Sequence, residues 1–282
     1  MTTVEARPAR ARAAGGIATF GGDPDLELQE LDVSAEALPG RLIVVEGIDG
    51  SGKSTQIDLL YKWLVGQGYL TVFTEWNSSP ATRGIIRRGK RRRLLTPMSF
   101  SMVHAADFAD RLSSQVLPAM HAGAVVLADR YIYTAFARDA ARGVPPEWLR
   151  HLYSFAATPT LALYFDVPLE EALRRITTSR ARINYYEAGM DLGLSDDIFE
   201  SFRLFQGRVL DEYESLSNEF ELTRIDATKT LVRQQKQVRA LVMPHLEGVR
   251  RMQGGDVTEA LRCAGLSGRY MPPPMFRSGG GE

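Results

Sequence analysis

The sequence predicts an α/β fold, a five-stranded parallel sheet flanked by helices and carrying a lid segment. First, five apolar segments rich in β-branched residues alternate with segments of helical periodicity, as in βαβ units. Second, one of these strands runs directly into a glycine-rich loop and then a helix. Third, charged residues close several strands at their carboxyl ends, where sheets of this class bind ligands.

The order of the elements follows from these patterns. The strands are expected at residues 41–47, 69–76, 124–130, 160–167 and 220–227. A helix is expected directly after residue 54, and the other helices at residues 98–121, 146–156, 169–178 and 198–217. Together they indicate one continuous domain over residues 40–250. Residues 1–39 are expected to be a disordered leader and residues 251–282, rich in Pro and Gly, a mostly disordered tail.

Composition narrows the classes of function. The 282 residues carry a formal net charge of zero, so nothing global indicates binding to nucleic acid or to a membrane. No apolar stretch approaches the length of a membrane-spanning helix. A single cysteine, Cys263, excludes an internal disulfide and is consistent with a reducing compartment. We therefore expect a cytoplasmic protein.

The stretch "GIDGSGKST", residues 47–55, matches the phosphate-binding pattern G-x-x-x-x-G-K-[ST]. Such a loop turns its backbone N–H groups toward a polyphosphate, and the following helix adds positive potential. Lys53 would reach the β- and γ-phosphates, and Ser54 would hold Mg²⁺. A chance glycine-rich turn is the alternative, but the strand and helix on either side argue against it. The expected ligand-binding positions are Gly47, Asp49, Gly50, Ser51, Gly52, Lys53, Ser54 and Thr55.

Charged residues stand at the carboxyl ends of the other strands. Asp129 could assist Mg²⁺ directly or through water, and Arg130 could hold the phosphate that accepts transfer. The alternative is a structural ion pair at the end of a strand. Glu75 and Asp166 close two further strands.

The stretch "RRITTSRAR" places several arginines around the end of a helix, which is typical of the mobile lid of a phosphoryl-transfer enzyme. Arg174, Arg180 and Arg182 are the candidates for contact with transition-state charge. A solvated helix face is the alternative. The basic run "RRGKRRR", residues 87–93, also favours a solvated helix face over a nucleic-acid patch, because no aromatic side chains are interleaved with it.

Four segments in this order resemble the thymidylate kinase-like family of P-loop nucleoside monophosphate kinases: "RLIVVEGIDGSGKSTQ", "VLADRY", "PTLALYFDVPLEEALRRI" and "FELTRIDATKT". The resemblance covers residues 41–238. It implies ATP with Mg²⁺ as phosphate donor, a nucleotide acceptor and often a homodimer. It also implies that Asp49 faces the acceptor's sugar or the metal, and that Ala227 and Thr228 border the adenine.

On the acceptor side the sequence departs from this family. Glu75 alone is kept from the family's Arg-Glu-Pro-Gly motif, and His104 and Phe108 stand where relatives place an aromatic ring and an arginine. Arg111 is the candidate substitute for that arginine, and Arg138 stands where relatives crowd the sugar. We expect these side chains to line one pocket beside Arg130; they are His104, Phe108, Arg111, Arg138 and Asp139. A cationic pocket of this kind predicts weak selection for thymine and dTMP as a mediocre substrate.

Three hypotheses about function follow. The leading hypothesis is phosphoryl transfer from ATP to a nucleoside monophosphate, with dTMP as the first candidate. The second keeps the enzyme class but changes the acceptor to another nucleotide, a nucleoside or another anion; for a hydroxyl acceptor, Glu75 could serve as general base. The third is an ATP-binding regulatory module without turnover.

Overall fold

The computed structural model describes residues 38–179, without the side chain of Ser179, and residues 183–251. The described residues all belong to one compact unit. Almost all of the predicted leader and of the predicted tail lies outside the described residues, as do Arg180 and Arg182 of the expected lid.

A parallel sheet of five strands forms the centre of the described chain, which confirms the predicted fold class. Its strand order is β2-β3-β1-β4-β5. The strands are β1 (Arg41–Glu46), β2 (Thr71–Glu75), β3 (Val125–Asp129), β4 (Leu161–Asp166) and β5 (Thr223–Asp226). All five end in a carboxylic acid. Because the strands are parallel, these acids gather along one edge of the sheet.

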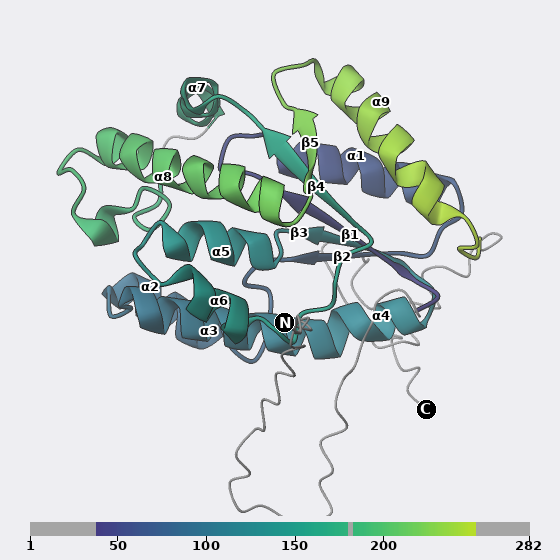
Figure 1. The fold of residues 1–282 in the computed structure, drawn as a ribbon, viewed down its shortest axis with the longest axis horizontal. Helices are drawn as coiled ribbons and strands as arrows, with labels where there is room; N and C mark the ends of the chain where they lie inside the picture. Colours follow the sequence, from purple (N-terminus) through teal and green to yellow (C-terminus); the bar gives the residue numbers. More distant parts are fainter. Residues whose placement is uncertain (1–37, 180–182, 252–282) are drawn as a thin grey trace, which may run out of the picture. The chain divides into compact units, whose positions relative to one another are not determined.

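Helices cover both faces of the sheet (Figure 1). The β1-to-β2 connection crosses β3 in one direction, whereas later connections run the opposite way along the sheet. Right-handed crossovers therefore put α1 (Lys53–Gly66) on one face and the later crossover helices on the other. The helices between β2 and β5 are α2 (Arg83–Arg92), α3 (Pro97–Arg111), α4 (Leu117–His121), α5 (Ile132–Ala140), α6 (Pro146–Leu152), α7 (Leu169–Ser179) and α8 (Ile198–Glu219). After β5, α9 (Leu231–Val242) packs against α1.

Most sequence-predicted helices are present, with two informative differences. The helix expected at 98–121 is α3 and α4 joined by the π-helical turn η2 (Leu112–Val116). This wider turn comes just before Pro118, whose ring would clash with the Ser114 carbonyl in a regular α-helix. Helices α5 and α9 were not predicted, because α5 is short and buried on most sides and α9 is rich in polar residues.

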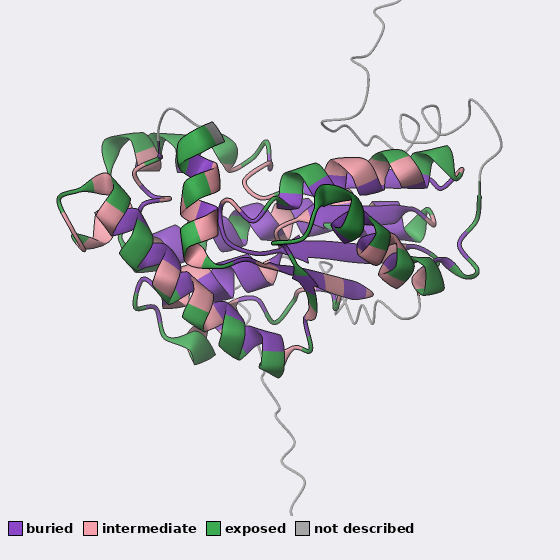
Figure 2. Cartoon of the chain, turned by 90° about the horizontal axis from the view of Figure 1, so that it is seen from above, coloured by how far each residue is buried: buried purple, intermediate pink, exposed green. Residues whose placement is uncertain are grey.

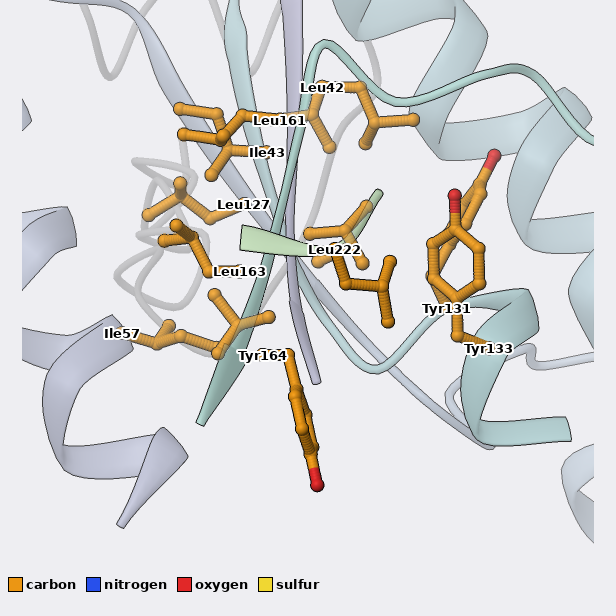
Figure 3. Packing of buried hydrophobic residues seen from close by; sticks show 14 of the residues in the cluster. Leu42, Ile43, Ile57, Leu127, Tyr131, Tyr133, Leu161, Leu163, Tyr164 and Leu222 are labelled. Carbon is orange, nitrogen blue, oxygen red and sulfur yellow. The ribbon is translucent and has the colours of Figure 1, made fainter. Parts of the chain in front are cut away.

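Apolar side chains fill both faces of the sheet. Figure 2 shows the strands almost entirely buried, while the surrounding helices alternate between buried and exposed stripes. In Figure 3, Ile43, Leu127 and Leu163 lie on the side of the sheet that holds Ile57 of α1, and Tyr131 and Tyr133 lie on the other. The carboxyl edge of the sheet is therefore a rigid base for a site. Two short 3₁₀ helices, η3 (Met190–Leu192) and η4 (Met243–Leu246), complete the described elements. No helix in the described part of the chain is long and apolar enough to cross a membrane.

Candidate active site

The glycine-rich loop lies between β1 and α1, as its sequence predicts. Gly47, Gly50 and Gly52 have φ values of 140°, 85° and 88°, which side chains rarely tolerate. A Cβ atom on Gly47 would lie 2.7 Å from the Phe165 carbonyl oxygen. The loop thus needs glycine both for its backbone shape and for its close approach to β4.

The amino end of α1 is open to a ligand. The helix begins at Lys53 after Gly52, and no side chain caps its first N–H groups. Uncapped N–H groups at a helix start, together with the helix dipole, favour an anion. The backbone therefore offers a phosphate site without help from distant residues.

Lys53 is buried beneath this loop. Its Nζ donates hydrogen bonds to the Ile48 carbonyl, at 2.9 Å, and to Ser51 Oγ, at 3.4 Å. Burial, with a contribution from the charge of Arg130, lowers the pKa of Lys53 to about 8. A bound polyphosphate would favour the charged form, so the lysine is suited to hold anionic oxygens.

A cleft of about 560 Å³, which we call the donor cleft, opens above the loop. Its walls include most of the predicted donor-site residues, and Trp76, Arg175 and Ile176 in addition. The predicted residues on its walls are Asp49, Gly50, Gly52, Lys53, Ser54, Thr55, Glu75, Asp129, Arg130 and Arg174. Gly47 and Ser51 are buried and do not line it. A volume of this size is in the usual range for small-molecule sites.

Ser54 and Asp129 meet at one side of the cleft. Ser54 Oγ donates to Asp129 Oδ2 at 3.3 Å, and Asp129 Oδ1 is buried without a hydrogen-bond partner in the described part of the chain. A hydroxyl and a carboxylate are the oxygen ligands that Mg²⁺ prefers. The residues present therefore fit the predicted metal.

Asp49 binds two arginines at once. Arg130 Nη2 contacts its Oδ1, and Arg138 Nη1 lies 2.8 Å from its Oδ2. Burial alone would raise the pKa of Asp49, but the two guanidinium groups, Arg130 before Arg138, hold that pKa well below its usual range. Arg130 thus takes part in an ion pair, as the alternative interpretation expected, while it also lines the cleft.

Glu46 supports the loop that carries Arg130. The backbone of Arg130 adopts the left-handed conformation, with a φ of 70°, which is uncommon for a residue other than glycine. Next to it, the fully buried Glu46 carboxylate accepts hydrogen bonds from the backbone N–H of Tyr131, at 2.7 Å, from Thr134 Oγ1, at 2.6 Å, and from Tyr213 Oη, at 2.8 Å. Sequence reasoning gave Glu46 no role, since nothing local distinguishes it from other acids that end strands.

A second cavity of about 180 Å³ adjoins the donor cleft, because Arg130 and Trp76 line both. His104, Arg138 and Asp139 lie on its walls, as predicted. We call it the acceptor pocket, and its other walls come from Asn77, Lys90, Phe100, Thr134, Ala135, Tyr186 and Glu187.

Phe108 and Arg111 do not line this pocket, so the expectation that five side chains share it is wrong for these two. Phe108 packs among Tyr131 and Tyr153, and Arg111 Nε and Nη2 both donate to Thr74 Oγ1. The helical spacing does place them on the same buried face of α3 as His104. However, only the first half of α3 reaches the pocket, and the second half packs against the sheet.

The other predicted residues are more scattered. Arg174 is largely exposed and pairs with Glu171. The Ala227 carbonyl accepts from Arg175 Nη2 at 2.9 Å, and Thr228 bonds Asp226; neither Ala227 nor Thr228 lines the cleft.

Sequence reasoning missed Trp76, Lys90 and Phe100 as pocket residues. Trp76 directly follows β2, and its place at the carboxyl end of a strand was a usable signal. Lys90 lay within the basic run that was interpreted as a solvated helix face, and Phe100 had no distinguishing neighbour.

Comparison with known proteins is consistent with this geometry. The family model described as thymidylate kinase matches residues 45–237. A probable thymidylate kinase 2 from Saccharolobus solfataricus is 39% identical over 209 residues, covering 74% of this chain and 98% of the relative. A probable thymidylate kinase from Thermococcus gammatolerans is 34% identical over 195 residues, covering 66% of this chain and 87% of the relative. A thymidylate kinase from Desulfotalea psychrophila is 34% identical over 182 residues, covering 64% and 90%.

Proposed function

The chain belongs to the thymidylate kinase family of phosphotransferases, and from this premise we propose that it transfers the γ-phosphate of ATP to the phosphate of dTMP. One observation carries the proposal: the glycine-loop cleft and the acceptor pocket meet at Arg130. Two phosphates can approach each other only where their sites adjoin. Catalysis of this kind requires positioning and charge stabilisation rather than a nucleophilic side chain.

On the donor side, the backbone of residues 50–55 would hold the ATP phosphates. Lys53 would exchange its bond to the Ile48 carbonyl for phosphate oxygens, and its charge would compensate the charge on the transferring group. Arg174, Arg180 and Arg182 would add positive charge when the lid closes. Ala227 and Thr228, which lie outside the cleft lining, would border the adenine, as the family resemblance implies.

Ser54 and Asp129 would hold Mg²⁺, for which the unpartnered Asp129 Oδ1 is a fitting ligand. When bound, the ion neutralises charge on the β- and γ-phosphate oxygens. Ser54 would turn its hydroxyl from Asp129 toward the ion.

On the acceptor side, Arg130 would bind the phosphate of the nucleotide. Asp49 binds both Arg130 and Arg138, which line the acceptor pocket, so these guanidinium groups are already oriented when the substrate arrives. The acceptor phosphate would take over one of these contacts, leaving Asp49 to face the sugar or the metal. Glu75, at the end of β2, lies on the wall of the donor cleft close to this junction.

The test is a transfer assay with purified protein, ATP and Mg²⁺ against dTMP, dUMP, dCMP, UMP and thymidine. We expect ADP and a nucleoside diphosphate as products, with dTMP among the good acceptors. Transfer only to thymidine would show a hydroxyl acceptor, and ATP binding without transfer would favour a regulatory module. Light scattering on the same sample tests the homodimer that the resemblance implies.

A further inference from the structure

Lys90 is the one member of the basic run 87–93 that lines the acceptor pocket. Ile86 and Gly89 are buried, so the helical period turns this side of α2 inward and brings Lys90 with it. The neighbouring arginines of the run are exposed; they are Arg87, Arg88, Arg91, Arg92 and Arg93. The run therefore combines a solvated face with a single cation that lines the acceptor pocket.

The ammonium group of Lys90 makes no hydrogen bond and no ion pair with any residue that the structure describes. It lies 5.1 Å from the centroid of the Phe100 ring, and the guanidinium groups of Arg138 and Arg142 repel it. Burial, followed by these charges, lowers its pKa to about 8, while Glu187 acts in the opposite direction. The group thus remains mostly protonated at neutral pH and offers its N–H donors to a ligand.

The position of Lys90 identifies the part of the ligand that it can reach. Arg130, where the acceptor pocket meets the donor cleft, is the place for the acceptor phosphate. Lys90 lines only the acceptor pocket, next to Phe100, which stacks on His104 with ring centroids 4.1 Å apart. Aromatic walls suit a planar base. The base of the nucleotide therefore belongs beside Lys90.

His104 has the opposite hydrogen-bonding role: Lys90 can only donate, whereas His104 offers an acceptor to the pocket. Its Nδ1 lies 2.8 Å from the Phe100 carbonyl oxygen, which can only accept, so Nδ1 carries the proton. Burial, and then the nearby Lys90 charge, hold the pKa of His104 well below its usual value, so the ring is neutral. Its Nε2 can then only accept a hydrogen bond.

Thymine and uracil carry a carbonyl oxygen next to a ring N–H, so a donor and an acceptor on the protein match this edge. Cytosine carries an amino group next to an unprotonated ring nitrogen, and it presents the reverse pattern. A hydrogen-bonding site that matches one pattern strongly rejects the other, because buried groups are then left unpaired.

Building on the function proposed above, we propose that Lys90 donates a hydrogen bond to the carbonyl oxygen of the acceptor base and so selects thymine or uracil over cytosine. Lys90 is then a specificity-determining residue. This replaces the expectation, based on Arg138 alone, that the pocket discriminates weakly for thymine.

The experiment compares Lys90→Met with the matched control Arg91→Met, an exposed neighbour on the same helix. For each, kcat/KM is measured with dTMP, dUMP and dCMP. We expect Lys90→Met to lower the dTMP-to-dCMP and dUMP-to-dCMP ratios roughly 10- to 100-fold, the usual loss for a charged hydrogen-bond donor. The KM for ATP should stay unchanged, and Arg91→Met should behave as wild type.

An equal loss for all three nucleotides would overturn the proposal, since Lys90 would then act on the phosphate that they share. Unchanged ratios would overturn it as well. Lys90→Gln, which keeps a donor on a shorter side chain, provides a second measurement, and thermal melting checks that both variants fold. If the wild-type protein transfers phosphate to none of these nucleotides, it is the proposed function that fails.

Discussion

The donor cleft and the acceptor pocket differ in what builds them. The donor cleft takes six of its lining residues from one stretch of nine, 47–55, in which three glycines adopt positive φ values. The acceptor pocket is lined by residues from α2, α3 and α5, from the segments that follow β2 and β3, and from the segment that precedes η3. A phosphate can be held by local backbone N–H groups, whereas a base requires groups placed around it from several directions.

This difference also appears in the charges. In the donor cleft, the uncapped N–H groups at the start of α1 can bind a polyphosphate, and Ser54 and Asp129 can bind one metal ion. At the acceptor pocket, Arg130 and Arg138 are held in ion pairs by Asp49, which itself lines the donor cleft, and a substrate must compete with this carboxylate. The two arginines of the acceptor pocket are therefore bound to a counterion that lies on the donor side.

The largest expected effect tests the donor side. Lys53→Ala should lower kcat on the order of a thousandfold, because the lysine compensates phosphate charge in the transition state. Steady-state kinetics measures this loss, and Lys62→Ala, an exposed lysine on the same helix, is the control. Turnover within a few-fold of wild type would show that the loop is not the phosphate site.

Arg130 and Arg138 both bind Asp49, but only Arg130 also lines the donor cleft. We expect Arg130→Met to reduce kcat/KM for the acceptor roughly 100- to 1000-fold, and Arg138→Met about tenfold or less. The two variants are compared at saturating ATP. Equal losses of kcat/KM would mean that Arg130, where the two sites meet, contributes no more to transfer than Arg138 does.

Glu46 connects β1 to the loop of Arg130, and thereby the donor side to the acceptor side. Glu46→Ala leaves buried donors without their acceptor, so the free energy of unfolding should fall by about 2–4 kcal/mol. Urea unfolding measures this change. The KM for the acceptor should rise while the KM for ATP changes little, and Glu46→Gln, which keeps an acceptor oxygen, should retain most of both properties. An unchanged acceptor KM in a folded Glu46→Ala variant would contradict the positioning role.

A further effect on stability, which depends on pH, is expected for Asp139 at the wall of the acceptor pocket. Burial raises the pKa of Asp139 from 3.8 to about 6, so the folded protein binds this proton more tightly than the unfolded chain does. The contribution of Asp139 to stability therefore falls as the pH rises between about 4 and 6. Relative to wild type, Asp139→Asn should gain up to about 3 kcal/mol of stability between pH ~4 and neutrality. Urea titrations at both pH values measure the gain, and a difference independent of pH would contradict it.

The acceptor pocket shows where sequence reasoning was incomplete. The spacing of His104, Phe108 and Arg111 correctly put these residues on one buried face of α3. It could not show that the pocket ends after the first turns and that the rest of the face packs on β2 and the aromatic core. For Lys90, the neighbouring basic residues of the run concealed the one cation that faces inward, because its direction depends on how α2 packs.

The sequence by itself determined the sheet, its carboxyl edge and the phosphate loop, because strand burial, glycine φ values and the start of a helix are properties of short segments. Only the tertiary structure decided which charges meet. Asp49 and Arg138 are 89 residues apart, and Glu46 and Tyr213 are 167 apart. No local pattern encodes such pairs, since they form only when α5 and α8 pack together beside β1. The donor chemistry can therefore be read from nine residues, and the choice of acceptor depends on the folded chain.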